Sequence, residues 1–284
     1  MDQRVLLQQP GPRRVIVLCD NESAHPSCGC EWGLSLAVDL GGGAQGGGLW
    51  LWDAGKTGLF VRNAGALGLD LGRARGLALS HGHYDHTGGL GALYSSTAFC
   101  GPIYAHPACA SERFAMDPDR TRSIGPPAAL PQFIPAGPLT RLAPGLMFLA
   151  DIPRAAGRFQ AVQGFSLDPV VVVPDLVPDD AFLVMESRSG PVVILGCCHS
   201  GLGNSLACLR ERLGITEIFA VLGGLHLFKA GEEALEETAQ AVEEFGVRRL
   251  VAGHCTGAER LARLRERLPG REVLPLAAGQ TWHF

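Results

Sequence analysis

The segment that most constrains this chain is Ser-His-Gly-His-Tyr-Asp-His at residues 80–86. It follows an apolar run at Gly76–Leu79 and precedes a Gly-Gly-Leu helix start, so we predict a loop that joins a buried strand to a helix. Three imidazoles and a carboxylate within six positions each need a partner when they leave water, and hydrophobic packing supplies none. A cation accepts all of them, which favours a metal-binding loop over a solvated polar loop with coincidental histidines.

The residue types in this loop indicate which metals are expected. Imidazole nitrogen with some carboxylate oxygen suits Zn²⁺, and Mn²⁺, Fe and Ni²⁺ remain alternatives. His81 and His83 lie two positions apart on a loop that leaves a strand, so both can turn toward one ion. Asp85 and His86 follow where the loop meets the helix and can face a second position. We therefore expect one or two ions.

Composition narrows the class of protein. The chain has 284 residues, 46% of them hydrophobic and 18% charged, which predicts a globular protein with a sizeable core. A net charge of −4 gives no reason to expect a nucleic-acid partner. No window approaches the roughly 18 apolar residues that a membrane span needs, and Met1–Arg14 lacks the apolar stretch of a signal peptide. A small-molecule substrate is therefore the expected partner.

The cysteines indicate the compartment. Their number, nine, is odd, and several lie in apolar runs, where a reduced thiol packs as a small hydrophobic group; these are Cys19, Cys197 and Cys208. We therefore predict a reducing, cytoplasmic location. Cys28-Gly-Cys30 resembles half of a zinc site, but two thiols without a second pair are a weak motif.

Strands and helices alternate in two similar halves. Strands are expected at Arg14–Leu18, Gly33–Leu40, Leu49–Asp53, Gly76–Leu79, Ile103–Ala105, Leu139–Leu142, Leu146–Leu149, Ala181–Glu186, Val192–Leu195, Glu217–Leu222, Arg249–Ala252, Val273–Leu276 and Gln280–Trp282. Helices are expected at Thr57–Leu67, Gly88–Ser95, Asn204–Leu213 and Glu232–Phe245, and from a Thr256/Glu259 capping box to Leu268. Two strand-rich halves that each close with helices predict an αββα sandwich. Its two packed sheets, with helices outside, would form a single domain over residues 1–284.

Three segments are predicted to lie outside this pattern. Gly41–Gly48 is rich in glycine and is expected to be a flexible hairpin tip. Residues 107–138 carry many prolines and little periodicity, and we expect a long surface excursion. This excursion would either cover a pocket or bind a second subunit, which would make a homodimer. A further loop is expected at Arg154–Asp180.

The positions of the other histidines are informative. His199, His226 and His254 each lie a few residues past the end of an apolar strand, in a turn that contains glycine. Because such loops converge on one rim of a sheet, we place His199 and His254 in the site. His226 either contacts metal or substrate or has a structural role. The histidines expected to have ordinary roles are His25, His106 and His283.

The sequence resembles metallo-β-lactamase-fold proteins from Cys19 to the C-terminus, and the His-x-His-x-Asp-His loop is highly specific to that superfamily. More narrowly, it resembles the subgroup of dihydropterin-ribofuranosylaminobenzene-phosphate synthase-like proteins. The matching stretches are Asp20-Asn21, Glu31–Ser35, Asp53–Gly55, Leu79–Leu90, Gly196–Gly201, Gly223–Leu227 and His254–Gly257. The resemblance implies the αββα fold. It also implies two ligand sets, His81, His83 and His199 for one metal, and Asp85, His86 and His254 for the other. Asp53 would orient a ligand histidine.

The chain departs from this pattern in one respect. Superfamily members usually place a bridging aspartate at the end of the strand between the last two ligand histidines. Here that strand ends in Gly223-Gly224-Leu225-His226, without a carboxylate. Losing this anion removes negative charge that offsets two dications, so the second site is expected to be weaker, empty or completed by His226.

The expected chemistry follows from a bound metal, which lowers the pKa of its water to about 7 and so provides a hydroxide nucleophile. Asp85 is predicted to bind an ion and to orient the nucleophile or accept its proton. His226 is predicted to donate to a developing oxyanion or a leaving group. The leading function is a metal-dependent hydrolase, or a transferase of the same chemistry, for a small pterin-like or phosphorylated substrate. The alternatives are a thioester or lactone hydrolase of the same fold and a non-catalytic metal-binding or ligand-sensing scaffold.

Candidate substrate contacts are Glu31, Trp32 and Ser200. Trp32 and Tyr84 would either stack on a flat ring or form a wall, and Glu31 would accept a substrate hydrogen bond or pair in a buried salt bridge. Ser200-Gly201 and the helix near Asn204 would offer N–H groups to a phosphate, unless Asn204 only caps the helix. The arginines of the excursion would either reach a phosphorylated ligand or stay solvated; these are Arg113, Arg120 and Arg122.

Overall fold

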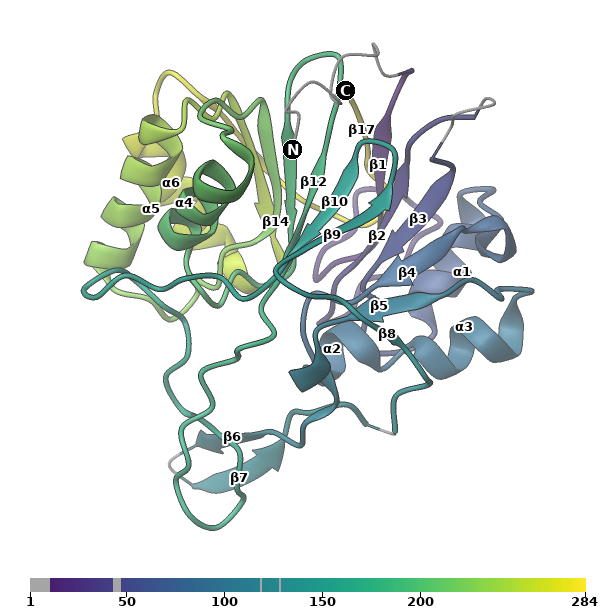
Figure 1. The fold of residues 1–284 in the computed structure, drawn as a ribbon, viewed down its shortest axis with the longest axis horizontal. Helices are drawn as coiled ribbons and strands as arrows, with labels where there is room; N and C mark the ends of the chain where they lie inside the picture. The colour runs from purple at the N-terminus through teal and green to yellow at the C-terminus, as the bar shows by residue number, and fades with distance from the viewer. Residues whose placement is uncertain (1–10, 43–46, 118, 128) are drawn as a thin grey trace.

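The computed structural model describes residues 11–42, 47–117, 119–127 and 129–284. Two seven-stranded sheets pack face to face, and helices cover both outer faces (Figure 1). The predicted αββα architecture is therefore confirmed. None of the helices in the described ranges is both long enough and apolar enough to cross a membrane.

The first sheet has the strand order β17-β1-β2-β3-β4-β5-β8. Its strands are β1 (Arg14–Cys19), β2 (Ser35–Asp39), β3 (Leu49–Trp52), β4 (Gly76–Ala78), β5 (Ile103–Ala105), β8 (Ile134–Pro135) and β17 (Thr281–His283). Strands β1 to β3 pair antiparallel, whereas β3, β4, β5 and β8 pair parallel. The helices of this half are α1 (Leu59–Ala66), α2 (Tyr84–Thr87) and α3 (Leu90–Ser96), with a 3-10 helix, η2, at Leu71–Arg73.

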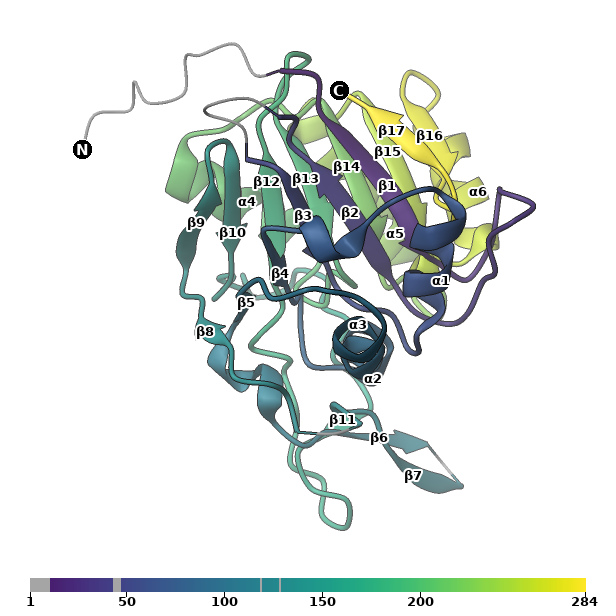
Figure 2. The same ribbon diagram turned by 90° about the vertical axis from the view of Figure 1, so that its right-hand side faces the viewer.

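The second sheet has the strand order β16-β15-β14-β13-β12-β10-β9. Its strands are β9 (Leu139–Ala143), β10 (Leu146–Leu149), β12 (Phe182–Met185), β13 (Val192–Leu195), β14 (Ala220–Gly224), β15 (Arg249–Gly253) and β16 (Glu272–Pro275). Strands β13 to β16 run parallel. The helices of this half are α4 (Leu202–Leu213), α5 (Glu232–Glu244) and α6 (Ala258–Arg267), with a 3-10 helix, η4, at His254–Thr256. Figure 2 shows β12, β13 and β14 behind β1, β2 and β3.

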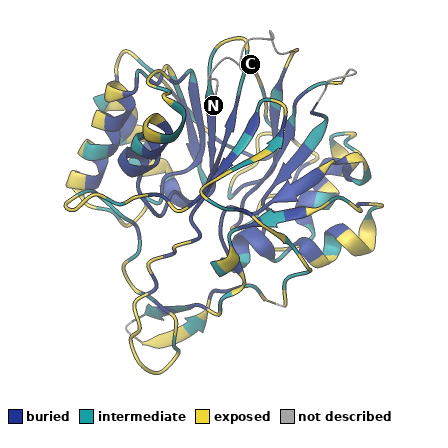
Figure 3. Cartoon of the chain, viewed as in Figure 1, coloured by how far each residue is buried: buried dark blue, intermediate teal, exposed yellow. Residues whose placement is uncertain are grey.

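The main core lies between the sheets. Strands such as β13, Val-Val-Ile-Leu, are buried at every residue because one face meets the other sheet and the other meets helices. The indole N–H of Trp52 donates to the carbonyl of Leu195 at 3.0 Å, which joins the two sheets. Figure 3 shows the strands as buried and the outward helix faces as exposed. Because the two sheets pack in this way, the ends of the parallel strands β4, β13, β14 and β15 lie at one edge of the sandwich.

The excursion at 107–138 contains more regular structure than predicted. It holds a 3-10 helix, η3 (Pro107–Ala110), a hairpin of β6 (Phe114–Asp117) and β7 (Arg120–Ser123), and the edge strand β8. Strand β6 also pairs with β11 (Phe165–Ser166) from the second long loop. The hairpin projects from the sandwich at the bottom of Figure 1. Prolines lie around these short strands rather than within β6 and β7, which is why the proline count was misleading.

Some local predictions were wrong. The Thr256/Glu259 capping box does not form: α6 follows Gly257, and the Thr256 hydroxyl accepts from the Leu225 N–H at 3.0 Å. The helix expected at Gly88–Ser95 forms as α3, at Leu90–Ser96, but a short helix that was not predicted, α2, precedes it and contains Asp85 and His86. Strands β2 and β3 pair as a hairpin, but residues 43–46 of its predicted tip lie outside the described residues.

Arg113 is neither solvated nor free to bind a ligand, contrary to both alternatives. It is fully buried and donates to Asp179 Oδ1 at 2.5 Å and to the Ala108 carbonyl at 2.9 Å. Asp175 lies 3.4 Å away as a second ion-pair partner. The other oxygen of Asp179 accepts from the Gly82 N–H at 2.7 Å. The ion pair therefore joins the hairpin excursion to the 80–86 loop.

We expect Arg113→Met to lower the free energy of unfolding by about 3–5 kcal/mol, because it leaves a buried carboxylate without its counterion. Urea unfolding followed by circular dichroism measures this loss. The matched control is Arg122→Met, which removes an exposed pair with Asp117 and should cost much less. Equal, small losses in the two variants would contradict the structural role given to Arg113.

Candidate metal centre

The histidine loops meet at one edge of the sandwich. The 80–86 loop follows β4, His199 follows β13, and His254 follows β15. The ring centroids of His83 and His199 lie 4.9 Å apart, and those of His86 and His254 lie 5.0 Å apart. All six predicted ligands are buried: His81, His83, Asp85, His86, His199 and His254. The structure thus brings together side chains that are distant in the sequence.

The first set is His81, His83 and His199. His81 Nε2 lies 3.0 Å from His83 Nδ1 and 3.3 Å from His199 Nε2. Tetrahedral zinc with Zn–N bonds of about 2.0–2.1 Å would separate its ligand atoms by about 3.4 Å. The spacing and the donor types of this set therefore fit one divalent ion.

The second set is Asp85, His86 and His254, whose ligand atoms all lie within 4.8 Å of one another. His254 Nε2 is 3.5 Å from Asp85 Oδ2, and it is buried without a hydrogen-bond partner. A buried nitrogen atom that has no hydrogen-bond partner and faces a carboxylate is the arrangement expected when a cation binds between the two groups. The rings of His81 and His86 lie 4.2 Å apart between centroids, so the second set adjoins the first.

Hydrogen bonds on the far side of the rings orient these ligands. His86 Nδ1 donates to Asp53 Oδ2 at 2.7 Å, as the resemblance implies for Asp53. His199 Nδ1 donates to the Ala161 carbonyl at 2.7 Å, and His254 Nδ1 lies 3.2 Å from Asn21 Oδ1. A ring that donates through Nδ1 presents the lone pair of Nε2 to the site.

Asp53 also organises the start of the 80–86 loop. It is fully buried and accepts from the N–H and the hydroxyl of Ser80, each at 2.7 Å. The same hydroxyl lies 2.8 Å from His81 Nδ1. One carboxylate therefore positions a histidine from each ligand set, directly for His86 and through Ser80 for His81.

Burial decides the charge of the histidines. It lowers the pKa values of His81, His83, His199 and His254 well below the ordinary value, which leaves the neutral form that binds metal. For His86 burial acts in the same direction, but the carboxylates of Asp53 and Asp85 outweigh it and raise the pKa. Burial raises the pKa of Asp85. The pocket therefore supplies neutral donors that need a cation to balance a carboxylate.

Two acids that the sequence did not single out position the loops. Asp179 binds the Gly82 N–H, and Asp180 Oδ2 accepts from the Ser200 N–H at 2.7 Å. Both are buried. They lie just before β12 and reach the loops of His81 and of His199. In the sequence, the role of Asp179 and Asp180 could have been suspected only from their adjacent positions at the end of a long loop.

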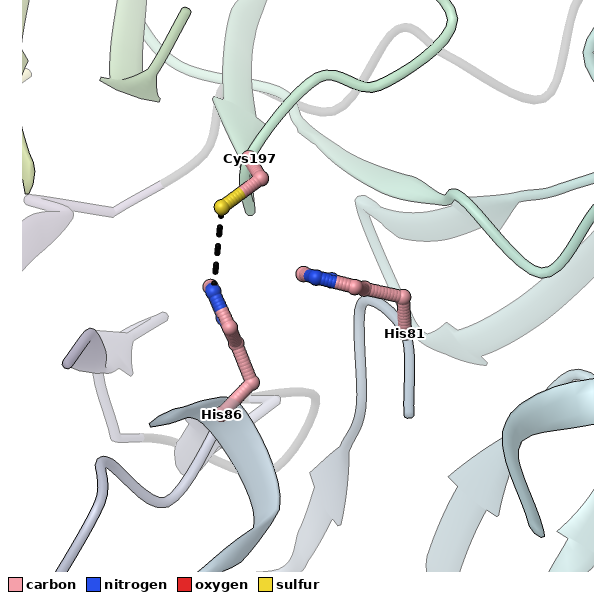
Figure 4. A group of neighbouring side chains, drawn as sticks. All are labelled: His81, His86 and Cys197. Carbon is pink, nitrogen blue, oxygen red and sulfur yellow. Dashed lines mark hydrogen bonds between the residues drawn. The ribbon is translucent and has the colours of Figure 1, made fainter. Parts of the chain in front are cut away.

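Cys197 was predicted to pack as a small hydrophobic group, and this was wrong. Its Sγ lies 3.2 Å from His86 Nε2, with His81 beside it (Figure 4). Burial raises the pKa of the Cys197 thiol well above its ordinary value, which favours the protonated S–H form. The Gly-Cys-Cys-His run that leads into His199 was the signal that could have indicated this position.

A cavity of about 1240 Å³ opens over the ligands. Its aromatic lining comes from Trp32, Tyr84, Phe159, Phe165 and Phe228, and its cationic lining from Arg122, Arg158 and Lys229. Its acidic lining comes from Asp85, Asp117, Glu232, Glu233 and Glu237. His226 also lines it, with its ring 4.5 Å from that of His199 between centroids. Burial lowers the pKa of His226 to about 4, so the imidazole is neutral at physiological pH.

Of the residues predicted to contact substrate, some line the cavity and others do not. Trp32 lines the cavity and packs against Phe228 and His254 at 5.6 and 5.5 Å between ring centroids. Glu31 is not part of the cavity lining, and no cationic side chain pairs with it in the described part of the chain. It accepts from the N–H groups of Lys56 and Thr57 and from the Thr57 hydroxyl, so its oxygens stabilise the turn after β3.

Ser200 does not line the cavity, because it is buried and its N–H is bound to Asp180. Asn204 does not cap α4 either; Gly201 precedes that helix with φ of 84°, and Asn204 bonds to the Ser200 carbonyl and the Ala155 N–H. Arg122 lines the cavity while paired with Asp117, and Arg120 is exposed. Among the described residues, Cys28 and Cys30 belong to no group of prospective ligands.

The histidines predicted to be ordinary lie outside these ligand groups. His106 pairs with Asp151 at 3.1 Å, and His25 accepts from the Ser27 N–H. His283 is exposed on β17.

Residues 38–254 match the family model described as the metallo-beta-lactamase superfamily, and the chain belongs to this superfamily. A solved structure described as Tm1679, a metal-dependent hydrolase of the beta-lactamase superfamily, aligns with a TM-score of 0.79 and 28% identity. The alignment covers 95% of this chain and 98% of that one. The fold alone is shared with YhfI from Bacillus subtilis, at a TM-score of 0.55 and 16% identity over 96% and 100% of the chains.

Two curated relatives come from Methanocaldococcus jannaschii. One, named 7,8-dihydropterin-6-methyl-4-(beta-D-ribofuranosyl)-aminobenzene-5'-phosphate synthase, is 29% identical over 190 residues. That alignment covers 63% of this chain and 65% of the synthase, which is less than two thirds of its length. The other, the uncharacterized protein MJ0448, is 26% identical over 88% of this chain and 93% of its own.

We expect Asp53→Asn to weaken metal binding about 10- to 100-fold, because the neutral amide no longer orients His86 as a ligand. Competition with a chromophoric chelator measures the affinity. Asp39→Asn, which alters an ion pair with Arg14 on β1, is the matched control and should bind metal as the unmodified protein does. Equal metal affinities in the two variants would show that Asp53 does not orient His86 as a metal ligand.

Proposed function

We propose that this chain is a metal-dependent hydrolase, or a transferase of the same site chemistry, that acts on a small planar and phosphorylated molecule. The observation that carries the proposal is that both ligand sets reach one cavity, through His83 and Asp85, and that the lining of this cavity includes aromatic rings and cationic as well as acidic side chains. A metal bound there would supply a nucleophile from water at neutral pH and polarise the bond to be cleaved. Zinc fits the donors best, and Mn²⁺, Fe and Ni²⁺ are the alternatives.

The protein side chains at the cavity have distinct roles in this proposal. Asp85 lines the cavity and belongs to the second ligand set, so its carboxylate can orient the attacking water. His226 is neutral and lies on the cavity wall beside His199, where its ring N–H can donate a hydrogen bond to a developing oxyanion or to a leaving group. Trp32 and Phe228 pack edge to face and form an apolar part of the cavity wall.

The lining supports the substrate class. Aromatic rings bind the face of a flat heterocycle, and cations bind a phosphate. Lys229 lies 5.3 Å from the ring centroid of Phe228, so a cation and an aromatic face adjoin on one wall. The relative from M. jannaschii carries a pterin and a phosphate in its name, and Tm1679 is described as a hydrolase. These observations favour a pterin-like or other phosphorylated aryl compound over an aliphatic thioester or lactone.

Turnover should require the metal and Asp85. We expect the zinc-loaded protein to cleave a phosphorylated aryl or pterin compound in a panel that also contains a phosphodiester, a lactone and a thioester. Chelation and Asp85→Asn should each abolish turnover, whereas Asp39→Asn should retain it. Cleavage of the thioester or lactone alone would contradict the proposed substrate class and favour a thioester or lactone hydrolase. Tightly bound metal without turnover of any compound in the panel would favour a metal-binding scaffold or sensor.

His226 should affect catalysis more than metal binding. We expect His226→Ala to lower kcat by about 10²- to 10³-fold with unchanged metal content, because it removes a hydrogen-bond donor to the developing charge and no essential ligand. Metal analysis and steady-state kinetics on the same preparation test this. His106→Ala, remote from the ligand groups and paired with Asp151, is the control. Parallel losses of metal and of turnover in His226→Ala would make His226 a ligand.

A further inference from the structure

Two thiols meet at the end of β14, where that strand has no side chain. Strand β14 lies between β13 and β15, and Cys197 and Cys255 follow these two outer strands. A Cβ at Gly224 would lie 2.5 Å from Cys255 Sγ and 3.4 Å from Cys197 Cα. A side chain at this position would therefore separate the two cysteines, whereas glycine lets them approach each other.

The two sulfur atoms are close together and reach a common space. Cys197 Sγ, Cys255 Sγ and a ring nitrogen of His254 all lie within 4.8 Å of one another. Cys255 Sγ donates to the Cys197 carbonyl at 3.7 Å and accepts from the His226 N–H at 3.3 Å, and these bonds hold it beside Cys197. Both cysteines line the cavity of about 1240 Å³, so a small solute that enters it can reach either sulfur.

The cysteines next to this pair have different surroundings. All nine cysteines of the chain are free thiols in the structure. Cys198 Sγ lies 3.6 Å from the Ser205 hydroxyl, and Cys198 and Cys208 both belong to the hydrophobic core around α4. In the described part of the chain, the cavity lining includes neither of them. Cys197 and Cys255 therefore form a pair that solutes can reach through the cavity.

We propose that Cys197 and Cys255 form a disulfide when a peroxide enters the cavity, and that this bond weakens metal binding at the adjoining centre. The first thiol is oxidised to a sulfenic acid as the O–O bond of the peroxide breaks, and one water leaves. The second sulfur then displaces the hydroxyl group, which leaves as a second water, and forms the S–S bond. The two thiols thus lose two protons and two electrons, which reduce hydrogen peroxide to two water molecules.

The effect on the metal follows from the position of Cys255 in η4, next to His254. His254 Nε2 lies 3.5 Å from Asp85 Oδ2, and both belong to the second ligand set. An S–S bond of about 2.05 Å draws the turn that holds Cys255 toward Cys197. This movement changes the separation of two ligands that must meet at one ion. The inference uses the candidate metal centre but not the proposed substrate.

The direct test is peptide mapping of the unmodified protein, freed of metal with a chelator, before and after treatment with hydrogen peroxide. Trypsin releases residues 189–210, which contain Cys197, and residues 250–260, which contain Cys255, as separate peptides. We expect the oxidised protein to yield these two peptides as one cross-linked species that a reductant separates. Sulfinic or sulfonic acids at the two cysteines without a cross-link would overturn the proposal.

Variants identify the partner of Cys255, because residues 189–210 also contain Cys198 and Cys208. Cys197→Ser should lose the cross-link. Cys198→Ser and Cys208→Ser are the matched controls and should keep it. A cross-link that persists in Cys197→Ser, or a disulfide between Cys197 and Cys198 in the unmodified protein, would overturn the assignment.

Zinc affinity measures the effect of the disulfide on the centre. In competition with a chromophoric chelator, the oxidised protein should bind zinc at least about tenfold more weakly than the reduced protein. Reduction with a phosphine should restore the affinity. Equal zinc affinities of the two forms would contradict the proposed effect. Because no step uses a substrate, a protein without turnover on every compound tried can still satisfy both measurements.

Discussion

Buried carboxylates that bind the backbone of the histidine loops are the interaction on which the rest of this structure depends. Asp53 accepts from the Ser80 N–H, and Asp179 accepts from the Gly82 N–H two residues later. Asp180 accepts from the Ser200 N–H beside His199. A buried ionised carboxylate is costly unless charged or polar hydrogen bonds compensate it, so these acids and the loops stabilise one another. Arg113 extends this network into the hairpin excursion by pairing with Asp179.

These contacts explain why neutral imidazoles face one another in a buried site. Burial favours the uncharged form of His81, His83, His199 and His254, whereas Asp53 and Asp85 raise the pKa of His86. Bonds from Nδ1 to Asp53 and to the Ala161 carbonyl point the Nε2 atoms of His86 and His199 inward. Lone pairs held this close repel one another unless a cation lies between them. The protein therefore uses folding free energy to assemble a site that a divalent ion stabilises.

Sequence patterns predicted the large features well and the small ones poorly. The αββα architecture followed from buried strands alternating with helices, and the 80–86 loop indicated where a metal would bind. The capping box at Thr256 failed because a tertiary contact with Leu225 uses the hydroxyl. Glu31 and Ser200, predicted as substrate contacts, do not line the cavity; backbone groups bind Glu31, and an acid from a distant loop binds the Ser200 N–H. Polar residues near a motif are as easily used to fix its loops as to bind a ligand.

The sequence by itself determined the sandwich and the types of ligand, because hydrophobic periodicity and imidazole chemistry are local properties. Only the tertiary structure decided which polar groups meet. Whether Arg113 is solvated or buried, and whether Cys197 or Cys198 faces the site, depends on contacts between segments about 60 to more than 100 residues apart. Cys197 and Cys198 follow β13 in a turn where Cys198 has a positive φ of 59°, so two identical neighbouring cysteines have different surroundings that neither composition nor spacing distinguishes.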